Sequence, residues 1–208
     1  MRGLIFKDFI NMKKQMKTYI MMIVLWAIIS VFSESGDFFS GVLLMIPALA
    51  VTAAMAYDDR YKWNGYALTM PVTRKDLVAS KYVLSFIFIT VTAMVSLIWQ
   101  LVMGEGISGS LESSAIIAAV AMLINGTAIP IFFYFGSEHG RIVFFAAAVI
   151  IGISSMGIIE EVVMADGSVK HYHVPTAGEI SLLALACAAV VAALSVFVSL
   201  RIYGSKEF

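Results

Sequence analysis

Residues 82–103 read YVLSFIFITVTAMVSLIWQLVM, an uninterrupted run without a charged residue. A bilayer core about 30 Å thick is crossed by roughly 20 apolar residues in an α-helix, so this run predicts a membrane-spanning helix. A strand of a membrane barrel would instead alternate apolar and polar residues. The whole chain agrees, because 61% of its residues are hydrophobic and 13% are charged, against about 45–50% and 25% in soluble domains.

Five further stretches have the composition of spans, and residues 181–200 are also free of charge. We therefore expect an all-α integral membrane protein, built as a single domain over residues 1–208. Six transmembrane helices are expected at about residues 18–33, 38–57, 82–103, 115–135, 142–159 and 181–203. In the last of these, small residues that favour close helix packing form a stripe at Ala184, Ala188 and Ala192.

The charges are distributed unevenly, although their sum is zero. All Lys and Arg residues except Lys170 fall on one side of the predicted membrane. By the positive-inside rule this side is cytoplasmic, so both termini are predicted to be cytoplasmic. The zero net charge gives no general attraction to nucleic acid. No span carries a charged residue near its middle, which argues against an ion-coupled transporter.

Residues 1–17, MRGLIFKDFINMKKQMK, precede the first span and have an amphipathic pattern. Apolar residues recur at helical spacing through Phe9 and Met12, with lysines on the other faces, which predicts a helix in the plane of the membrane. This interfacial helix is either a simple anchor or an element that packs on the spans and on a cytoplasmic partner. Its candidate functional residues are Phe6, Lys7, Phe9, Lys13 and Lys14.

Only short sequence patterns in this chain resemble those of catalytic sites. The sequence contains no P-loop, so ATP binding by that route is excluded and no cofactor is expected in this chain. Residues 106–109 read GISG and resemble the GxSG pattern of intramembrane serine proteases, with Ser108 in the place of the nucleophile. A membrane-embedded hydrolase is therefore one alternative function, and a non-catalytic membrane scaffold is another.

The predicted extracellular loop, residues 160–180, carries a second group of reactive side chains. Glu160 and Glu161 resemble the start of a motif of membrane prenyl-protein proteases, but the arginine of that motif is missing. His171 and His173 could join these acids around a metal. We expect a solvated loop without a metal, folded as a small hairpin or as two short helices.

Residues 58–81 read DDRYKWNGYALTMPVTRKDLVASK and join the second and third predicted spans on the cytoplasmic side. Three aromatic residues, Tyr61, Trp63 and Tyr66, lie among charges, a composition typical of protein interfaces. The alternative is that these rings rest in the lipid headgroups. A short amphipathic helix is predicted over Asp59–Leu68.

A second helix start follows this segment. Pro71 interrupts the chain, and Thr73 is a predicted N-cap for a helix that begins at Arg74, with Asp76 at the third helical position. This helix is expected to continue through Lys81 into the third span.

The same loop resembles that of the permease subunits of the type 2 ABC exporter family, in its short bacterial branch. The similarity lies in the acidic start at Asp58, in KW at 62–63, in YALTMPV at 66–72 and in RKD at 74–76. The start of the chain, GLIFKD at 3–8, is similar to the entry helix of that family. One departure is Asp59, where the family often has Glu.

The resemblance implies a permease in the bacterial plasma membrane, with ATP and magnesium bound by a separate ATPase chain. Two ATPase copies and a second permease, as a homodimer, are the implied partners, and an amphipathic peptide is the implied cargo. Spans one, two and five usually line the pathway in relatives. The loop would be the coupling helix that docks on the ATPase, with contacts from Asp58, Asp59, Arg60, Tyr61, Lys62, Trp63, Tyr66, Leu68, Arg74 and Lys75.

Overall fold

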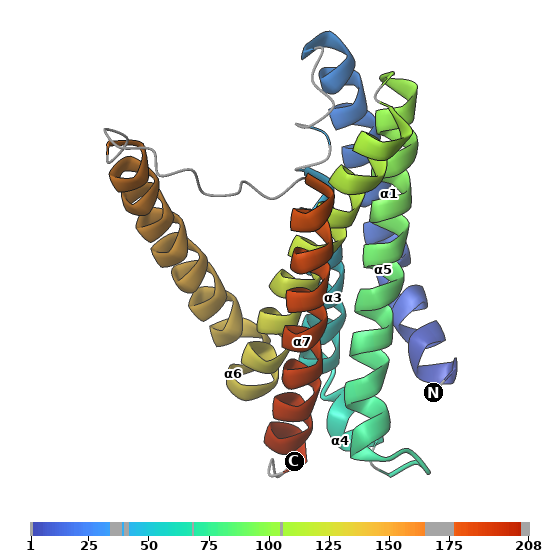
Figure 1. Cartoon of the computed structure of the whole chain (residues 1–208). Coiled ribbons are helices and arrows are strands. Elements are labelled where there is room, and N and C mark those ends of the chain that lie inside the picture. The colour runs from blue at the N-terminus through green and yellow to red at the C-terminus, as the bar shows by residue number, and fades with distance from the viewer. Residues whose placement is uncertain are drawn as a thin grey trace.

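The structure, a computed structural model, describes residues 2–33, 39, 42–67, 69–104, 106–164 and 177–204. All regular secondary structure in these residues is helical, which confirms the all-α prediction. The helices, in chain order, are α1 (Arg2–Ser33), α3 (Met45–Arg60), α4 (Trp63–Ala67), α5 (Arg74–Val102), α6 (Ile107–Met164) and α7 (Ala177–Gly204). Figure 1 shows both chain ends and α4 towards the same end of the molecule.

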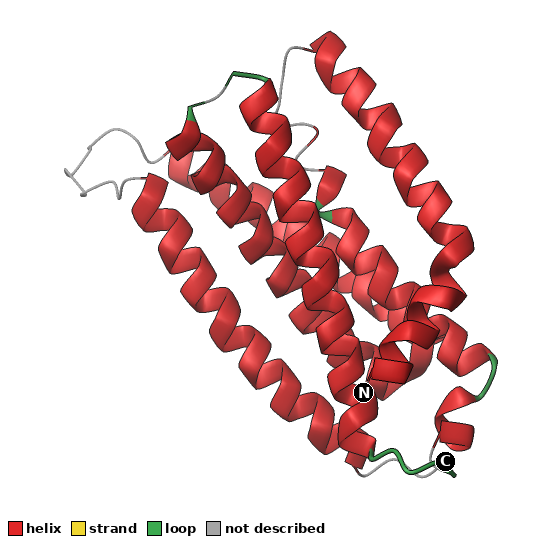
Figure 2. Cartoon of the chain, turned by 90° about the vertical axis from the view of Figure 1, so that its right-hand side faces the viewer, coloured by secondary structure: helices red, strands yellow, loops and turns green. Residues whose placement is uncertain are grey.

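Within the described residues, four stretches are long and apolar enough to cross a membrane: Gln15–Phe32, Arg74–Val102, Ile107–Ala146 and Ser181–Gly204. They contain the fourth and sixth predicted spans, and the first and third except for the last residue of each. The long helices lie side by side with connections at the two ends of the bundle (Figure 2). The chain is therefore a multi-pass membrane protein, and the number of six spans stays a prediction.

Most of the second predicted span lies in α3, Met45–Arg60, and residues 38, 40 and 41 of that span lie outside the described residues. Pro47 lies in the first turn of this helix. A proline is tolerated there because the first amide groups of a helix have no intrahelical acceptor, whereas further inside the helix its ring would meet a preceding carbonyl.

The predicted interfacial helix and the first span form one continuous helix, α1, of 32 residues. Met12 and Tyr19 are buried in a cluster with α3 and α5, and Phe9 and Met16 pack against this cluster. The Phe9 ring stacks on Phe88 of α5 with centroids 5.9 Å apart. The apolar face of the first residues therefore packs on the bundle.

Helix α6 consists of two arms that meet at Gly136 and diverge from there, as Figure 1 shows. Gly136 has φ 77° and ψ 175°, and helical geometry resumes directly after it. The predicted spans at 115–135 and 142–159 leave residues 136–141 as their connection, but only Gly136 departs from helical geometry there. Gly140 permits the close return, because a methyl group at that position would lie 2.8 Å from the Phe132 ring.

The first arm of α6 packs on α7 through a polar link inside the apolar bundle. Pro130 has no N–H, so the carbonyl of Gly126, one turn earlier, lacks its helical donor. The Ser195 hydroxyl of α7 donates to that carbonyl. Tyr82 of α5 joins this link, with its hydroxyl 2.6 Å from Ser195 Oγ and 2.8 Å from Ser199 Oγ. Backbone groups inside a bilayer need such internal partners.

Small residues of α7 lie at this contact, as the sequence pattern predicted. Ala188 is fully buried. A methyl group on Gly126 would meet Val191 at 3.6 Å and the Cα of Ala192 at 3.8 Å, so the two helices approach to van der Waals distance.

Candidate functional site

Four charged side chains from three helices form a buried cluster at the end of the bundle near α4. Lys7 and Asp8 come from α1, Asp58 from the last turn of α3, and Lys81 from the start of α5. Lys81 Nζ lies 2.8 Å from Asp8 Oδ2 and 2.6 Å from Asp58 Oδ2. Lys7 Nζ pairs with Asp58 and lies 3.1 Å from Asp8 Oδ1.

The cluster is electrically balanced, with two ammonium groups and two carboxylates. Asp8 is 1% exposed and Asp58 is 4% exposed. Charges buried to this extent persist only when they are paired, and removal of one partner leaves another charge uncompensated. The cluster therefore holds the first turns of α1 to the end of α3 and to the start of α5.

Trp63 of α4 contacts the same cluster. The Lys7 ammonium lies over its ring, 4.5 Å from the ring centroid, in a cation–π arrangement. The ring packs against a core that includes Leu77 and Tyr203, and its Nε1 has no hydrogen-bond acceptor among the described residues. Trp63 is thus an anchor of α4 within the chain.

Asp59 follows Asp58 directly in the chain, yet its side chain makes a different contact. Asp59 Oδ2 accepts a hydrogen bond of 2.7 Å from the backbone N–H of Ser137. Ser137 is the first residue after the non-helical Gly136, so the carboxylate caps the second arm of α6. The end of α3 therefore contacts both α1 and the turn of α6.

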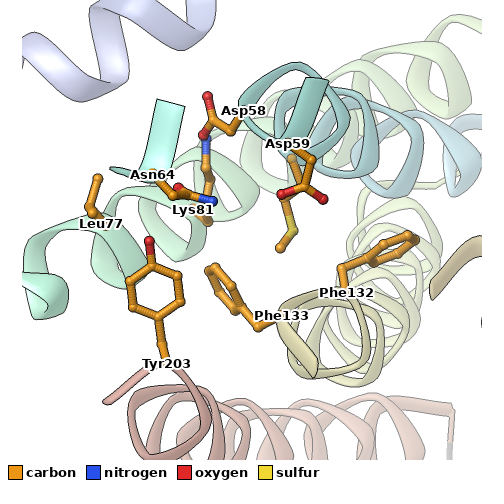
Figure 3. A pocket seen from close by; sticks show the side chains of 9 residues that line it. Asp58, Asp59, Asn64, Leu77, Lys81, Phe132, Phe133 and Tyr203 are labelled. Carbon is orange, nitrogen blue, oxygen red and sulfur yellow. The ribbon is translucent and has the colours of Figure 1, made fainter. Parts of the chain in front are cut away.

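A small polar cavity of about 40 Å³ lies between these contacts. Figure 3 shows the Lys81 nitrogen beside Asp58, and the Tyr203 hydroxyl directed into the cavity from the opposite side. The volume exceeds the ~10–15 Å³ that one water molecule needs. The cavity is lined by Met55, Asp58, Asp59, Asn64, Leu77, Lys81, Phe132, Phe133 and Tyr203.

Helix α4 separates its inward residues from its outward residues. Ala67 is fully buried, one turn after Trp63. Tyr66 is 58% exposed, and Tyr61, in the turn before α4, is 69% exposed. The bounds predicted for this helix, Asp59–Leu68, are wrong. Helix α3 continues to Arg60, and a turn at 61–62 separates it from α4.

The start of α5 confirms the predicted cap. The Thr73 hydroxyl accepts from the Asp76 backbone N–H, and the Asp76 carboxylate accepts from the Thr73 backbone N–H. Arg74 Nη1 donates to the carbonyl of Gly204 at 2.7 Å, at the end of α7. A cation at the C-terminus of a helix is favourable for its dipole and its last carbonyls.

The predicted partner contacts therefore fall into two groups. Asp58, Asp59, Trp63 and Arg74 make contacts within the chain. Five residues are accessible at the surface near α4: Arg60 and Lys62, Tyr61 and Tyr66, and Lys75. Leu68 lies outside the described residues.

The predicted functional residues of α1 also differ in their surroundings. Phe6 and Lys13 are exposed, Phe9 packs on α5 and Lys7 belongs to the buried cluster. The Lys14 side chain lies outside the described part of the structure. Sequence reasoning missed Asp8, although it is the one acidic residue among the basic residues of 1–17.

The described residues give the alternative chemistries little support. Ser108 is exposed near the start of α6, and His139 lies three residues beyond Gly136, past the end of the first arm. The 28 helical residues from Ser108 to Gly136 span about 42 Å, so this pair cannot form a nucleophile and base. The described residues contain no group of three metal-ligating side chains. The side chains of Glu160, Glu161, His171 and His173 lie outside them.

Comparison with known proteins gives one match. A family model described as ABC-2 family transporter protein matches residues 3–204. Neither the curated proteins nor the solved structures contain a match.

Proposed function

The chain belongs to the ABC-2 transporter family, and on that premise we propose that it is an exporter permease driven by a separate ATPase chain. Membership of the family makes it a membrane transport subunit and not itself a catalytic one. The observation that carries the coupling part of the proposal is the accessible surface near α4. We define this docking face by Arg60, Tyr61, Lys62, Tyr66 and Lys75.

The docking face has the chemistry of a protein interface. Tyr61 and Tyr66 expose large rings, and the three basic residues are exposed as well and add positive charge to this face. Tyrosine and arginine are enriched at interface centres, and basic rims steer partners of opposite charge. The partner we propose is the ATPase chain, in two copies for a homodimer of permeases.

The contacts behind the docking face support transmission of its motion. The two-residue turn at 61–62 joins α4 to α3, and Lys7 and Lys81 join that end of α3 to α1 and α5. Asp59 joins it to the turn of α6. A displacement of α4 would therefore reach α3 through the turn, and α1, α5 and α6 through the charged contacts of α3.

A groove between α1, α3 and the second arm of α6 is a candidate for the translocation pathway. Its volume is about 520 Å³, and its walls are mostly apolar, with Met22 of α1, Leu49 of α3 and Phe145 of α6 among them. Arg141 and Gln15 supply polar groups. These helices correspond to the first, second and fifth predicted spans. We propose that the groove forms part of the pathway for an amphipathic peptide.

The test is a double variant of the docking face, Tyr61→Ala with Tyr66→Ala, co-expressed with the ATPase chain. Both rings are exposed, so the bundle should keep its stability, while co-purification and permease-dependent ATP hydrolysis should fall at least tenfold. The matched control is Phe197→Ala, because Phe197 is an exposed aromatic residue of α7 within a candidate span. Full retention of both activities by the double variant would contradict the docking role.

A further inference from the structure

A second pocket opens on the outside of the bundle, between α5, α6 and α7, away from the docking face and from the groove described above. Its volume is about 310 Å³, at the lower end of the range of small-molecule sites. Three polar residues line it, Tyr82, Ser85 and Asn125. The rest of its wall is mostly apolar, including Val83, Phe86, Ile89, Met122 and Ile129.

Asn125 is the unusual feature of this pocket. Its side chain is 2% exposed, and its Nδ2 donates to the Ala121 carbonyl at 2.9 Å. That bond fixes the orientation of the amide, because Oδ1 in the same place would face another oxygen. Asn125 Oδ1 has no hydrogen-bond donor among the described residues. A buried acceptor without a donor is destabilising, and most so within a bilayer.

The neighbouring polar groups do not supply the donor. Tyr82 bonds to Ser195 and Ser199, and the Ser195 hydroxyl is directed at the Gly126 carbonyl. These hydroxyl groups therefore already have partners. Asn125 lines the pocket, which is large enough for a molecule that brings its own donor to the side chain with the unsatisfied acceptor.

The depth of Asn125 restricts what that molecule can be. Asn125 precedes the turn at Gly136 by eleven residues of helix, about 16 Å along the axis. The fourth predicted span ends at residue 135 and the hydrocarbon core is about 30 Å thick, so that prediction places Asn125 near the middle of the core. A phospholipid places its polar groups at the interface, and only its hydrocarbon tails would reach this depth.

We propose that this pocket binds an apolar alcohol or phenol dissolved in the membrane. The hydroxyl group donates to Asn125 Oδ1, and the hydrocarbon body fills the space between α5, α6 and α7. This ligand is distinct from the exported peptide, because the pocket lies outside the groove of α1, α3 and α6. The inference does not rest on the proposed function, since binding is measured on the permease alone.

The test uses a matched pair of probes on the full chain in nanodiscs: a diazirine-bearing 4-pentylphenol and its methyl ether. The two share one apolar body, but only the phenol has a donor. Labelling of residues 82–89 and 122–129 by the phenol should exceed labelling by the ether roughly fivefold to tenfold, the effect of one hydrogen bond. In Asn125→Leu the two probes should label equally.

Equal labelling of the wild-type chain by both probes would overturn the proposal, because a resident water would then satisfy Asn125. A phenol preference that survives in Asn125→Leu would overturn it as well. Val83→Phe, which fills the pocket, should reduce labelling by both probes. Val91→Phe is its control, since Val91 is an exposed residue of α5 outside the pocket. Undiminished labelling of a folded Val83→Phe chain would contradict the pocket.

One further arm distinguishes the source of the ligand. Lipids extracted from the native membrane are added in excess before illumination of the wild-type chain. Loss of phenol labelling would support a hydroxylated lipid as the natural occupant. Retained labelling, with the phenol preference intact, would support a foreign alcohol or phenol.

Discussion

The carboxylate of Asp59 accepts a hydrogen bond of 2.7 Å from the backbone nitrogen of Ser137, so the last turn of α3 caps the second arm of α6. This contact joins residues that are 78 positions apart in the chain. It fixes the point at which the two arms of α6 diverge.

Loss of this cap should loosen the turn of α6. Asp59→Ala removes the acceptor and is expected to lower the free energy of unfolding by about 1–2 kcal/mol. Asp59→Asn retains an oxygen that can accept from Ser137, so its loss should be smaller. Thermal unfolding of the purified chain in one detergent gives the comparison. An Asp59→Ala chain as stable as the wild type would refute the capping role.

The buried charge cluster should respond to charge balance more than to any single contact. Lys81→Met leaves Asp8 and Asp58 with one cation between them, and we expect a loss of about 3–5 kcal/mol. Adding Asp8→Leu restores neutrality and should recover much of that loss. The four chains of this double-mutant cycle are compared by unfolding in the same detergent. If the double variant loses as much stability as the two single variants together, the argument from charge balance is contradicted.

The hydroxyl of Ser195 should matter because Pro130 provides no amide hydrogen for Gly126. Ser195→Ala should lower stability by about 0.5–1.5 kcal/mol, the range of hydrogen bonds between membrane helices. In a chain that also carries Pro130→Ala, residue 130 can donate to Gly126, so removal of the hydroxyl should cost less. If Ser195→Ala lowers the stability equally with and without Pro130→Ala, this compensation is excluded.

Three glycines of α6 should differ in their tolerance of alanine. Gly136→Ala places a side chain at φ 77° and ψ 175°, a region nearly restricted to glycine, which costs about 1–3 kcal/mol. Gly140→Ala would bring a methyl group 2.8 Å from Phe132, so it should also destabilise the chain. Gly126→Ala is the control, because its nearest neighbour would lie at 3.6 Å. A Gly126→Ala chain less stable than the other two would invert this order and reject the argument.

Much of the fold follows from the sequence because its causes are local. The uncharged run at 82–103 is a helix in α5, and the Thr73 cap needs only residues within one turn. The reversal at Gly136 was expected at the right place but as a longer turn. A single glycine suffices there because Asp59, distant in the chain, supplies the cap.

The candidate site was predicted less well because adjacent residues have opposite surroundings. Asp58 and Asp59 look equivalent in the sequence, yet one pairs with lysines of α1 and α5 while the other caps α6. Trp63 has the composition of a partner contact, but its position beneath Lys7 depends on how α1 packs. Such burial depends on the tertiary arrangement, which no local pattern encodes. The accessible tyrosines Tyr61 and Tyr66 remain the predicted partner contacts.

The dependence of α6 on Ser195 has a consequence for biosynthesis. Gly126 leaves the ribosome 69 residues before Ser195 does, which is roughly 3–14 s at typical elongation rates. During this interval the Gly126 carbonyl enters the bilayer with neither a helical nor a side-chain donor. The bond from Arg74 to the Gly204 carbonyl forms later still, because the two residues are 130 positions apart in the chain. The nascent bundle therefore acquires both of these polar contacts only when α7 has been synthesised and inserted.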